Sequence, residues 1–364
     1  MNSIEANITA LLQGPDEARE AALDALIAAG EAAIDPLIAL LAGYESWEAY
    51  AAAPQPFNAA EAALIAIGTP AVLPLIAALH SERWGEEMGA IYCLGELGDP
   101  RAIQPLIERL DADRDRLSAI GRALAGFGAQ ALRPLIDALA HGASSARRGA
   151  AHLLGQYRDP LAASALIAAL ADPDAGVRAA AAGALAAHAD ARAVEPLIAV
   201  MDDKDPAVRE NAVRALGETA LRLGGRRSLE ALRGALTDTD WGTRQSAAEM
   251  LARLGADADG QARALLQADL RSTEAELRLG AAWSLLPLIE QMPDARTQVA
   301  EALAPLLYHA DPRISASAAL ALGELGDRRA VPALRAARRT GDSQLRHAAQ
   351  HALDKLGCVD DSLD

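Results

Sequence analysis

Two histidines and an aspartate near the end of the chain are the side chains best spaced for chemistry. In the segment RHAAQHALD, His347 and His351 are four residues apart and Asp354 follows three residues later, so a helix would place all three on one face. Such a pair can chelate Zn²⁺ or Ni²⁺, but a complete site needs three or four ligands. We therefore interpret the pattern as an exposed helix face, and predict neither a bound metal ion nor a cofactor.

Residues for nucleophilic catalysis are not grouped along the sequence. Serines and histidines are scattered, and there is no G-x-S-x-G nucleophile motif and no paired cysteine–histidine signature. The segment GELGD occurs at Gly95 and at Gly323, where it follows a helical pattern and marks a helix end rather than a phosphate-binding loop. We predict no catalytic residue and favour a non-enzymatic function.

The net charge argues against a polyanionic ligand. The 364 residues carry a formal net charge of -16, which disfavours binding to nucleic acid. The best basic cluster, DRRAVPALRAARRTGD, fits a solvated end of the protein. No apolar run approaches the roughly 18 residues that span a bilayer, and the first residues lack the features of a secretory signal. We predict a cytoplasmic protein without membrane insertion, in which Cys93 and Cys358 are unpaired.

Internal repeats decide the fold. Three segments share one template: DPRAIQPLIERL from Asp99, DPLAASALIAAL from Asp159 and DARAVEPLIAVM from Asp190. A second template alternates with it, as in DPDAGVRAAAAGALAA from Asp172 and DPAVRENAVRALGE from Asp205. In both, an aspartate can cap the free N–H groups of a helix, proline is tolerated in the first turn, and apolar residues recur every three or four positions.

The repeating unit is therefore a pair of antiparallel helices. Equivalent positions in four second helices are Pro105, Pro134, Ala165 and Pro196. They are roughly 30 residues apart, as expected of a helix-pair repeat. We count about ten pairs, with an N-terminal cap helix at about 3–13 and a C-terminal cap helix at about 342–356. Because neither helix can bury its apolar stripe alone, each pair must stack on its neighbours. The sequence predicts an all-α fold, an α–α superhelix that forms one domain over 1–364.

The run DPxVRxxAxxALGxxGDxRAVxPLIxxL, clearest in residues 205–217 and 190–201, resembles the short HEAT-like repeats of bacterial proteins, the type also found in phycobilisome lyases. The resemblance covers nearly the whole chain and implies a bacterial HEAT-like solenoid. One HEAT-like family, deoxyhypusine hydroxylase, holds a di-iron centre through His-Glu dipeptides, and none of the seven histidines here precedes a glutamate. The lyases attach a bilin to a phycobiliprotein cysteine; on that alternative, Tyr92 and the aromatics near Trp84 would line a tetrapyrrole groove.

A further regularity is an arginine near the start of most first helices. Stacked pairs would align these side chains in an arginine ladder, each donating a bidentate hydrogen bond to an aspartate of a neighbouring turn, such as Asp172 or Asp205. The arginines are Arg19, Arg147, Arg178, Arg209, Arg244, Arg278 and Arg346. The ladder lapses at Phe57, Glu87, Ser118 and Ser315. We interpret the ladder as structural. The breaks at Phe57, Glu87 and Ser118 fall in consecutive repeats, and we interpret them as a local departure from the repeat pattern.

The segment AGYESWEAYAAAPQPFN brings four aromatics together in a chain that is 3% aromatic. It carries an insertion of roughly seven residues, at about 43–57, and such insertions in repeat proteins become loops on one face. Asn58 and Glu61 have the spacing of a capping box that starts the next helix. Two interpretations stay open: the rings of Tyr44, Trp47 and Tyr50 cover the end of the array, or they anchor a partner.

The second candidate surface is the concave face, which we expect the second helices to line. Their polar positions carry charges of both signs, which suits a protein or peptide better than a polyanion. The predicted partner-binding residues are Tyr44, Trp47, Tyr50, Phe57, Trp84, Tyr92, Gln104, Glu108, Arg133, Asp137, Glu195, Glu230 and Arg263. The sequence thus favours a non-catalytic scaffold that binds a protein partner, with a subunit of a chromophore lyase as the alternative.

Overall fold

A computed structural model describes residues 3–43, 46, 55–111, 113–256, 261–291 and 293–358. All regular secondary structure in these ranges is helical, which confirms the predicted all-α class. The chain divides into two compact units, residues 1–165 (unit 1) and 166–364 (unit 2), and each unit is described by itself. The organisation of 1–364 as a single domain stays a prediction.

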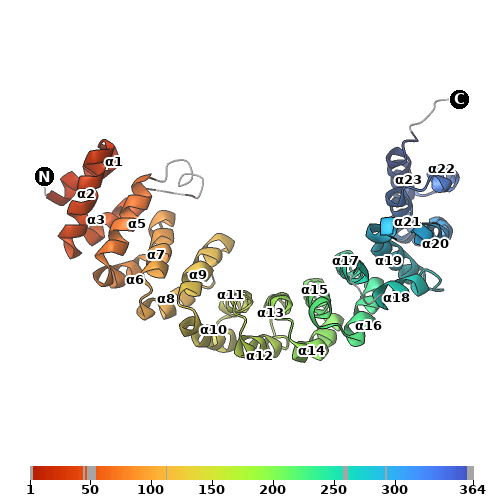
Figure 1. Cartoon of the computed structure of the whole chain (residues 1–364), viewed down its shortest axis with the longest axis horizontal. Coiled ribbons are helices and arrows are strands. Elements are labelled where there is room, and N and C mark those ends of the chain that lie inside the picture. Colours follow the sequence, from red (N-terminus) through yellow and green to blue (C-terminus); the bar gives the residue numbers. More distant parts are fainter. Residues whose placement is uncertain are drawn as a thin grey trace. The chain divides into compact units, whose positions relative to one another are not determined.

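Unit 1 contains the helices of the first part of the chain (Figure 1). They are α1 (Ser3–Gln13), α2 (Asp16–Ala29), α3 (Glu31–Leu41), α5 (Gln55–Ile67), α6 (Val72–Ala78), α7 (Trp84–Leu97), α8 (Ile103–Ile107), α9 (Arg114–Gly126), α10 (Ala129–His141) and α11 (Ser144–Leu154). The boundary between the units falls within α12 (Pro160–Ala169). Short 3-10 turns precede α6 (Thr69–Ala71) and α8 (Pro100–Ala102).

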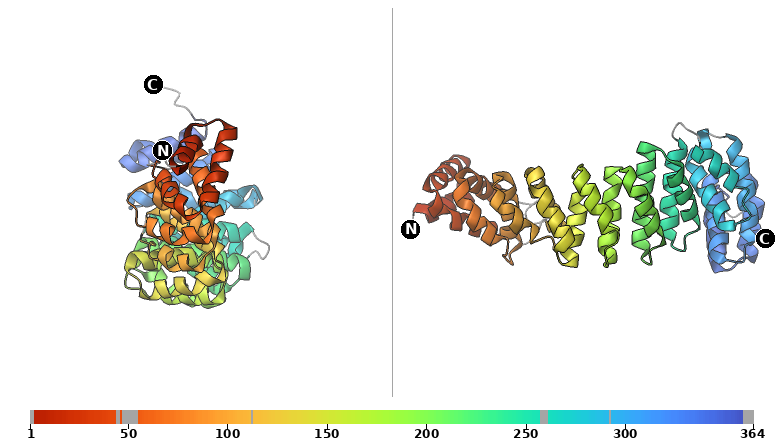
Figure 2. Two further views of the ribbon diagram at one scale, coloured as in Figure 1. Left: turned by 90° about the vertical axis from the view of Figure 1, so that its left-hand side faces the viewer. Right: turned by 90° about the horizontal axis from the view of Figure 1, so that it is seen from below.

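Unit 2 continues the same alternation. Its α-helices are α13 (Ala175–His188), α14 (Val194–Ala199), α15 (Pro206–Leu223), α16 (Arg226–Gly234), α17 (Trp241–Ala256), α18 (Gln261–Asp269), α19 (Ala275–Leu285), α20 (Pro293–Leu303), α21 (Pro312–Leu325), α22 (Val331–Thr340) and α23 (Ser343–Lys355). Its 3-10 segments are Ala191–Ala193, Val200–Asp202, Ala235–Thr237, Leu286–Gln291, Ala304–Tyr308 and Arg328–Ala330. Within each unit, successive helices lie side by side as pairs (Figure 2).

The described helices make ten pairs, from α2 with α3 to α21 with α22, and α1 and α23 stand outside the pairs. These two helices occupy the places predicted for cap helices, at about 3–13 and 342–356, and their capping role stays a prediction. First helices pack on the first helices of neighbouring pairs, for example α5 on α7 and α7 on α9 in unit 1, and α13 on α15 in unit 2. The first helices therefore form a continuous layer within each unit.

In unit 2, the first helices lie on the inner side of the unit's curve, and α14, α16 and α18 lie on the outer side (Figure 1). The expectation that second helices line the concave face is therefore wrong for this unit. The first helices are rich in small residues, as in AGVRAAAAGALAAH of α13. Because interaxial distance depends on the side chains at the contact, helices of this kind can approach more closely than the leucine- and isoleucine-rich second helices.

Helix starts follow the predicted chemistry. Asp99 accepts a hydrogen bond from the Arg101 N–H, and Asp205 accepts one from the Ala207 N–H. The prediction that Asp172 opens a helix is wrong, because the cap of α13 is Asp174, which accepts a hydrogen bond from the Val177 N–H. Pro173 lies in the turn before the helix, so the aspartate that follows it is the one adjacent to the free N–H groups.

Helix ends also follow the prediction made from GELGD. Gly98 and Gly326 end α7 and α21 in the left-handed region, with φ of 63° and 70°. The first glycine of each segment permits close helix packing. A Cβ on Gly95 would lie 2.8 Å from the Ala123 Cα of α9, and a Cβ on Gly323 would lie 2.8 Å from the Ala352 Cα of α23. Both positions are therefore restricted to glycine by a neighbouring backbone.

The arginine ladder forms in unit 2. Arg178 donates two hydrogen bonds to the Asp203 carboxylate, at 2.7 and 2.9 Å, and Arg209 donates two to Asp238, both at 2.8 Å. The hydrogen bond from Arg178 lowers the pKa of the Asp203 carboxyl below its ordinary value. These acceptors differ from the predicted Asp172 and Asp205, since an aspartate that follows the second helix of the pair lies within reach of the guanidinium.

The remaining nitrogen of these guanidinium groups holds the loop before the helix. Nη1 of Arg178 donates to the Asp172 carbonyl at 2.8 Å. The same loop bond recurs in five further repeats: Arg147 to Gly142 O, Arg209 to Asp203 O, Arg244 to Asp238 O, Arg278 to Ser272 O and Arg346 to Gly341 O. Arg19 instead forms an ion pair with Asp16 of its own helix, at 3.3 Å. The structural interpretation of the ladder thus rests on two kinds of hydrogen bond.

The predicted aromatic insertion falls largely outside the described residues, which include neither Tyr44, Trp47 and Tyr50 nor the side chain of Phe57. Its end is described, because α5 begins at Gln55. The prediction that Asn58 and Glu61 form the capping box that starts this helix is therefore wrong. Glu61 is buried against neighbouring helices, and its side chain has another environment, given below.

No single helix in the described ranges has the length and apolar composition needed to cross a membrane. One pair, Asn58–Ile67 with Thr69–Ala78, reaches the required length and apolarity together, but the two helices meet at 110°. Both cysteines, Cys93 and Cys358, are free thiols, as the sequence predicts.

Candidate binding groove

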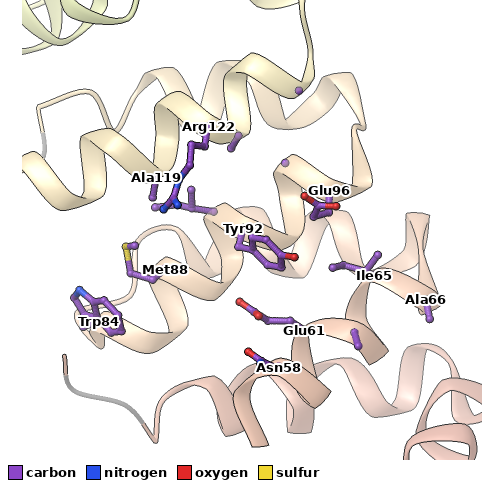
Figure 3. A pocket seen from close by; sticks show the side chains of 15 residues that line it. Asn58, Glu61, Ile65, Ala66, Trp84, Met88, Tyr92, Glu96, Ala119 and Arg122 are labelled. Atoms are coloured by element: carbon purple, nitrogen blue, oxygen red, sulfur yellow. The ribbon is translucent and has the colours of Figure 1, made fainter. Parts of the chain in front are cut away.

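A groove of about 880 Å³ lies in unit 1 between the first helices α5, α7 and α9 (Figure 3). Its lining residues come from one face of each helix, with apolar and polar side chains mixed. They are Asn58, Glu61, Ala62, Ile65, Ala66, Trp84, Met88, Ile91, Tyr92, Gly95, Glu96, Ala119, Arg122, Ala123 and Gly126. Asn58, Tyr92, Glu96 and Arg122 are exposed, so the groove is open to solvent.

Helix α7 supplies the central wall of the groove. Trp84, Met88, Tyr92 and Glu96 are spaced by four residues and line the groove together. Side chains at this spacing lie one above the other on a helix. Tyr92 is 49% exposed, which is unusual for a large ring in a chain that is 3% aromatic. The helix thus presents an indole, a thioether, a phenol and a carboxylate in a row.

Helix α9 supplies the opposite wall, and small residues open the space in front of it. Ala119, Ala123 and Gly126 line the groove on α9, and Arg122 extends from this helix toward the groove (Figure 3). Because Gly95 of α7 lies against the backbone of Ala123, the two helices are close at one end of the groove. Larger side chains on α9 would fill the volume that is open here.

Helix α5 contributes a buried carboxyl group. Glu61 is only 7% exposed, and its side chain points from α5 into the groove (Figure 3). Burial raises the pKa of Glu61 from an ordinary value of 4.5 to about 8. Beneath it, the Cys93 thiol donates a long hydrogen bond to the Glu61 carbonyl at 3.9 Å, and burial raises the pKa of this thiol as well.

The start of α7 is fixed by an ion-pair cluster in which the ladder position carries the opposite charge. Glu87 is 1% exposed and accepts hydrogen bonds from Arg109 at 2.8 Å and from Arg116 of α9 at 2.6 Å. Arg116 also pairs with Asp113, the cap of α9. One buried carboxylate therefore links α7 to the loop after α8 and to α9, which holds two walls of the groove in place.

Two of the predicted partner-binding residues, Trp84 and Tyr92, lie in this groove. The predicted residues on second helices do not gather at one place and lie in both units. Gln104 hydrogen-bonds Glu108 at 3.3 Å, and Arg133 and Asp137 are exposed on α10. In unit 2, Glu195 pairs with Arg227 at 2.9 Å, and Glu230 pairs with Arg226 at 2.9 Å. The side chain of Arg263 lies outside the described residues.

Sequence reasoning missed most of the groove. Asn58, Glu61, Met88, Glu96 and Arg122 were not among the predicted residues. A signal for part of the set was present, because Met88 and Glu96 continue the four-residue spacing of Trp84 and Tyr92. The contributions of α5 and α9 depend on which helix faces pack together, and a sequence spacing within one helix does not give that.

No cluster of three or more histidine, cysteine, aspartate or glutamate side chains suited to a metal ion occurs among the residues that the structure describes. At the histidine pair near the end of the chain, both His347 and His351 are exposed on α23. Nδ1 of His347 lies 2.7 Å from the Ser343 carbonyl, within the first turn of the helix. The pattern is that of a solvated helix face.

Comparison with known proteins identifies the repeats. Family models of HEAT repeats match five overlapping stretches, residues 57–125, 115–186, 163–252, 194–286 and 262–354. No curated protein shows significant similarity to the chain.

Solved structures share the fold at low identity. A mutant of Kap121p is 16% identical, over 97% of this chain and 44% of its own, with a TM-score of 0.52. Importin beta is 14% identical, over 97% of this chain and 55% of its own, with a TM-score of 0.51. An engineered protein is 22% identical, over 98% of this chain and 99% of its own, with a TM-score of 0.39. The first two similarities concern the fold alone.

Proposed function

The chain belongs to the HEAT-repeat family, and we propose that it is a non-catalytic scaffold that holds a protein partner in the groove between α5, α7 and α9. Repeat arrays of this kind present a layer of helix faces that no single repeat could offer. The groove lies on the layer of first helices, and we place the partner there rather than on the second helices.

The observation that carries the proposal is the row of side chains that α7 presents to the groove. Tyr92 and Trp84 line an open groove, in a chain where aromatic residues are scarce. Tyrosine and tryptophan dominate binding hot spots because they bury a large area with few rotatable bonds. Small-molecule sites enclose most of their ligand, whereas seven of the fifteen lining residues of this groove are exposed to solvent, which suits a segment of a protein chain better.

Several expectations remain part of this proposal. We place the protein in the cytoplasm of a bacterium. We also propose that the aromatic insertion at about 43–57 and the predicted second-helix residues make at most supporting contacts with the partner. The alternative function, a subunit of a chromophore lyase, draws no support from the groove or the comparisons. It predicts a red-shifted, tightly held pigment when the purified protein is mixed with a bilin.

Site-specific photo-cross-linking in the source cell tests the groove. A photoreactive phenylalanine analogue replaces Tyr92 in one version of the protein and Tyr308 in a matched control, since Tyr308 is also exposed, at 66%, but lies in unit 2. We expect one defined protein adduct from position 92 and none from position 308, and loss of that adduct when Trp84→Ala is added. The same adduct from both positions, or an adduct that Trp84→Ala leaves unchanged, would overturn the proposal.

A further inference from the structure

One acidic group in the groove has no partner among the described side chains. The other buried carboxylates of the described residues are paired: Glu87 with two arginines, Asp269 with Arg233 and Asp327 with Arg329. Glu61 is 7% exposed, its carboxyl oxygens accept no hydrogen bond from the described residues, and its carboxylate is directed into the open groove (Figure 3). A carboxyl in this position is open to a cationic group supplied from outside.

The surroundings of Glu61 are suited to a cation. Trp84 and Tyr92 stand on the same groove wall, and the faces of their rings carry partial negative charge that attracts ammonium and guanidinium groups. Glu96 adds a second carboxylate at the end of the row, and Met88 gives the wall an apolar, polarizable stretch. Figure 3 shows the Glu61 carboxylate and the Tyr92 ring directed into the same space.

We infer that the groove binds a basic segment of a protein partner, whose lysine or arginine side chain inserts beside Trp84 and Tyr92 and pairs with the Glu61 carboxylate. This inference rests on the proposed function, because it specifies the chemistry of the partner for the same groove. The apolar part of a lysine or arginine side chain would lie along Met88 and Ile65, and the charged end would reach Glu61. The net charge of -16 favours a basic partner at long range as well.

The other charged groups around Glu61 decide whether a cation is favoured. On α7 they are Glu96 and the Cys93 thiol, whose pKa is raised in part by Glu61 itself. On α9 the only charged lining residue is Arg122, which is exposed and extends toward the groove, where its guanidinium opposes a second cation. Helices α2 and α3 also pack on α5, but none of their described residues lines the groove. With Glu61 ionised, the groove walls carry two carboxylates and one guanidinium, so the balance is negative.

Binding of a cation is linked to a proton. In the empty groove Glu61 has a pKa of about 8 and is largely protonated at pH 7. A lysine or arginine side chain pairs with the ionised form, so binding releases the Glu61 proton to solvent. Affinity should therefore rise with pH, by roughly tenfold between pH 6.5 and pH 8, and level off above the pKa. A partner that instead accepts a hydrogen bond from the protonated carboxyl would bind more weakly as pH rises.

The test uses the full chain and four nine-residue peptides that differ only in their central residue, which is lysine, arginine, norleucine or glutamate between leucines. Nine extended residues reach about 30 Å, enough to cross three helices. Titration calorimetry at pH 6.5, 7.5 and 8.5, in two buffers of different ionisation enthalpy, gives both affinity and proton release. We expect the lysine and arginine peptides to bind at least about tenfold more tightly than norleucine at pH 8.5. Proton release should approach one at pH 6.5 and be much smaller at pH 8.5, where Glu61 is already mostly ionised.

Variants assign the effect to the groove. Glu61→Gln should remove most of the lysine preference together with the pH dependence, and Trp84→Leu should weaken the lysine and arginine peptides. Glu20→Gln, an exposed change on α2 outside the groove, should leave every affinity unchanged. The pH series on the unmutated protein keeps the test valid if a variant fails to fold.

Four outcomes would overturn the inference. They are equal affinity for lysine and norleucine, tightest binding of the glutamate peptide, a lysine preference that survives Glu61→Gln, and no binding of any peptide. The first would leave the groove as an apolar docking site, so the proposed function would stand. The cross-linking from position 92 decides the proposed function separately in every case.

Discussion

The first helices α13 and α15 in unit 2 and the first helix α7 in unit 1 carry opposite charges at the same position, the fourth residue of the helix. In unit 2 the position carries Arg178 or Arg209, and the guanidinium reaches the aspartate that follows the second helix of the same pair. In unit 1 it carries Glu87, and two arginines reach it instead. The ion pair at this position is kept while its charges are exchanged.

The exchange shows that the ladder position is constrained by pairing rather than by the identity of arginine. A glutamate side chain is shorter and has no nitrogen to hold the preceding loop, whereas Nη1 of Arg178 binds the Asp172 carbonyl. The loop before α7 is therefore organised differently, and α7 begins with the aromatic Trp84 of the groove. The replacement of arginine by Glu87 at the ladder position therefore accompanies a different surface beside it, the groove lined by Trp84.

The same comparison extends to the aromatic residues of the first helices. Trp283 of α19 has the register that Tyr92 has in α7, counted from the helix starts at Ala275 and Trp84. The Trp283 indole N–H donates to the Ser317 hydroxyl at 3.1 Å, which ties α19 to α21. Tyr92 lines the open groove. One ring connects repeats, and the other is presented to solvent.

The largest expected loss of stability comes from disrupting the Glu87 cluster, in which the ladder position carries a carboxylate instead of a guanidinium. Glu87→Gln leaves Arg109 and Arg116 without their buried carboxylate, and should lower the free energy of unfolding by about 3–5 kcal/mol. Urea unfolding followed by circular dichroism measures the loss, and hydrogen exchange should locate it in α7, α8 and α9. Glu108→Gln is the matched control. A loss of less than about 1 kcal/mol would show that the cluster is not a structural link.

The ion pair of Arg178 with Asp203 should contribute less than the Glu87 cluster, because its carboxylate is less buried and only one arginine is involved. Arg178→Gln removes the paired hydrogen bonds to Asp203 and should cost about 2–3 kcal/mol. The double variant with Asp203→Asn should cost less than the sum of the two single changes. Additive losses would contradict a direct interaction between the two side chains.

A pH-dependent effect should distinguish the groove from the ladder. The folded state raises the pKa of Glu61 from 4.5 to about 8, so the unfolded chain loses its proton first as pH rises, and stability falls between those values. Glu61→Gln abolishes this loss. The variant should match the unmodified protein at pH 4.5 and be the more stable of the two at pH 8.5. The full shift corresponds to roughly 4–5 kcal/mol, and solvent in the open groove should reduce the difference to about 1–2 kcal/mol. Thermal unfolding at both pH values makes the comparison, and equal differences at the two would contradict it.

The smallest expected effect is on the exposed face of unit 2. Glu195 and Arg227 form an ion pair at 2.9 Å with side chains 66% and 59% exposed. Because solvent screens such pairs, Glu195→Gln should change the free energy of unfolding by less than about 0.5 kcal/mol. The same urea experiment checks this value. A loss of unfolding free energy close to that of Arg178→Gln would contradict the expectation that exposed ion pairs contribute less to stability than half-buried ones.

Much of the fold follows from local patterns. Asp-Pro pairs, periodic apolar residues and GELGD segments specify helix starts, faces and ends within about 30 residues, so the helix pairs follow from the sequence. The arginine ladder was also visible, although its acceptors were misassigned. Asp172 and Asp205 are adjacent to helices in sequence, whereas Asp203 and Asp238 are adjacent to the guanidinium groups in space.

The groove was only partly predictable. Trp84 and Tyr92 were noticed because they are rare, and Met88 and Glu96 could have been added from spacing on one helix. Glu61 was interpreted as a capping residue, because its spacing from Asn58 can be read directly from the sequence. Its burial between α5 and α7 depends on how the two helices pack, which the sequence spacing does not give. The Glu87 cluster joins residues 22 and 29 positions apart, and nothing in the spacing alone indicates which arginines they are.

The buried thiol of Cys93 gives the groove region a built-in reporter. Its Sγ faces the Glu61 carbonyl across the α5–α7 contact, whereas Cys358, after the last helix, is only half-buried. Cys93 reacts with an alkylating reagent only when these two helices separate, because the thiolate that attacks the reagent forms only in contact with water. The modification rate of Cys93 relative to Cys358 therefore measures how often α5 and α7 come apart, and an occupied groove should slow it.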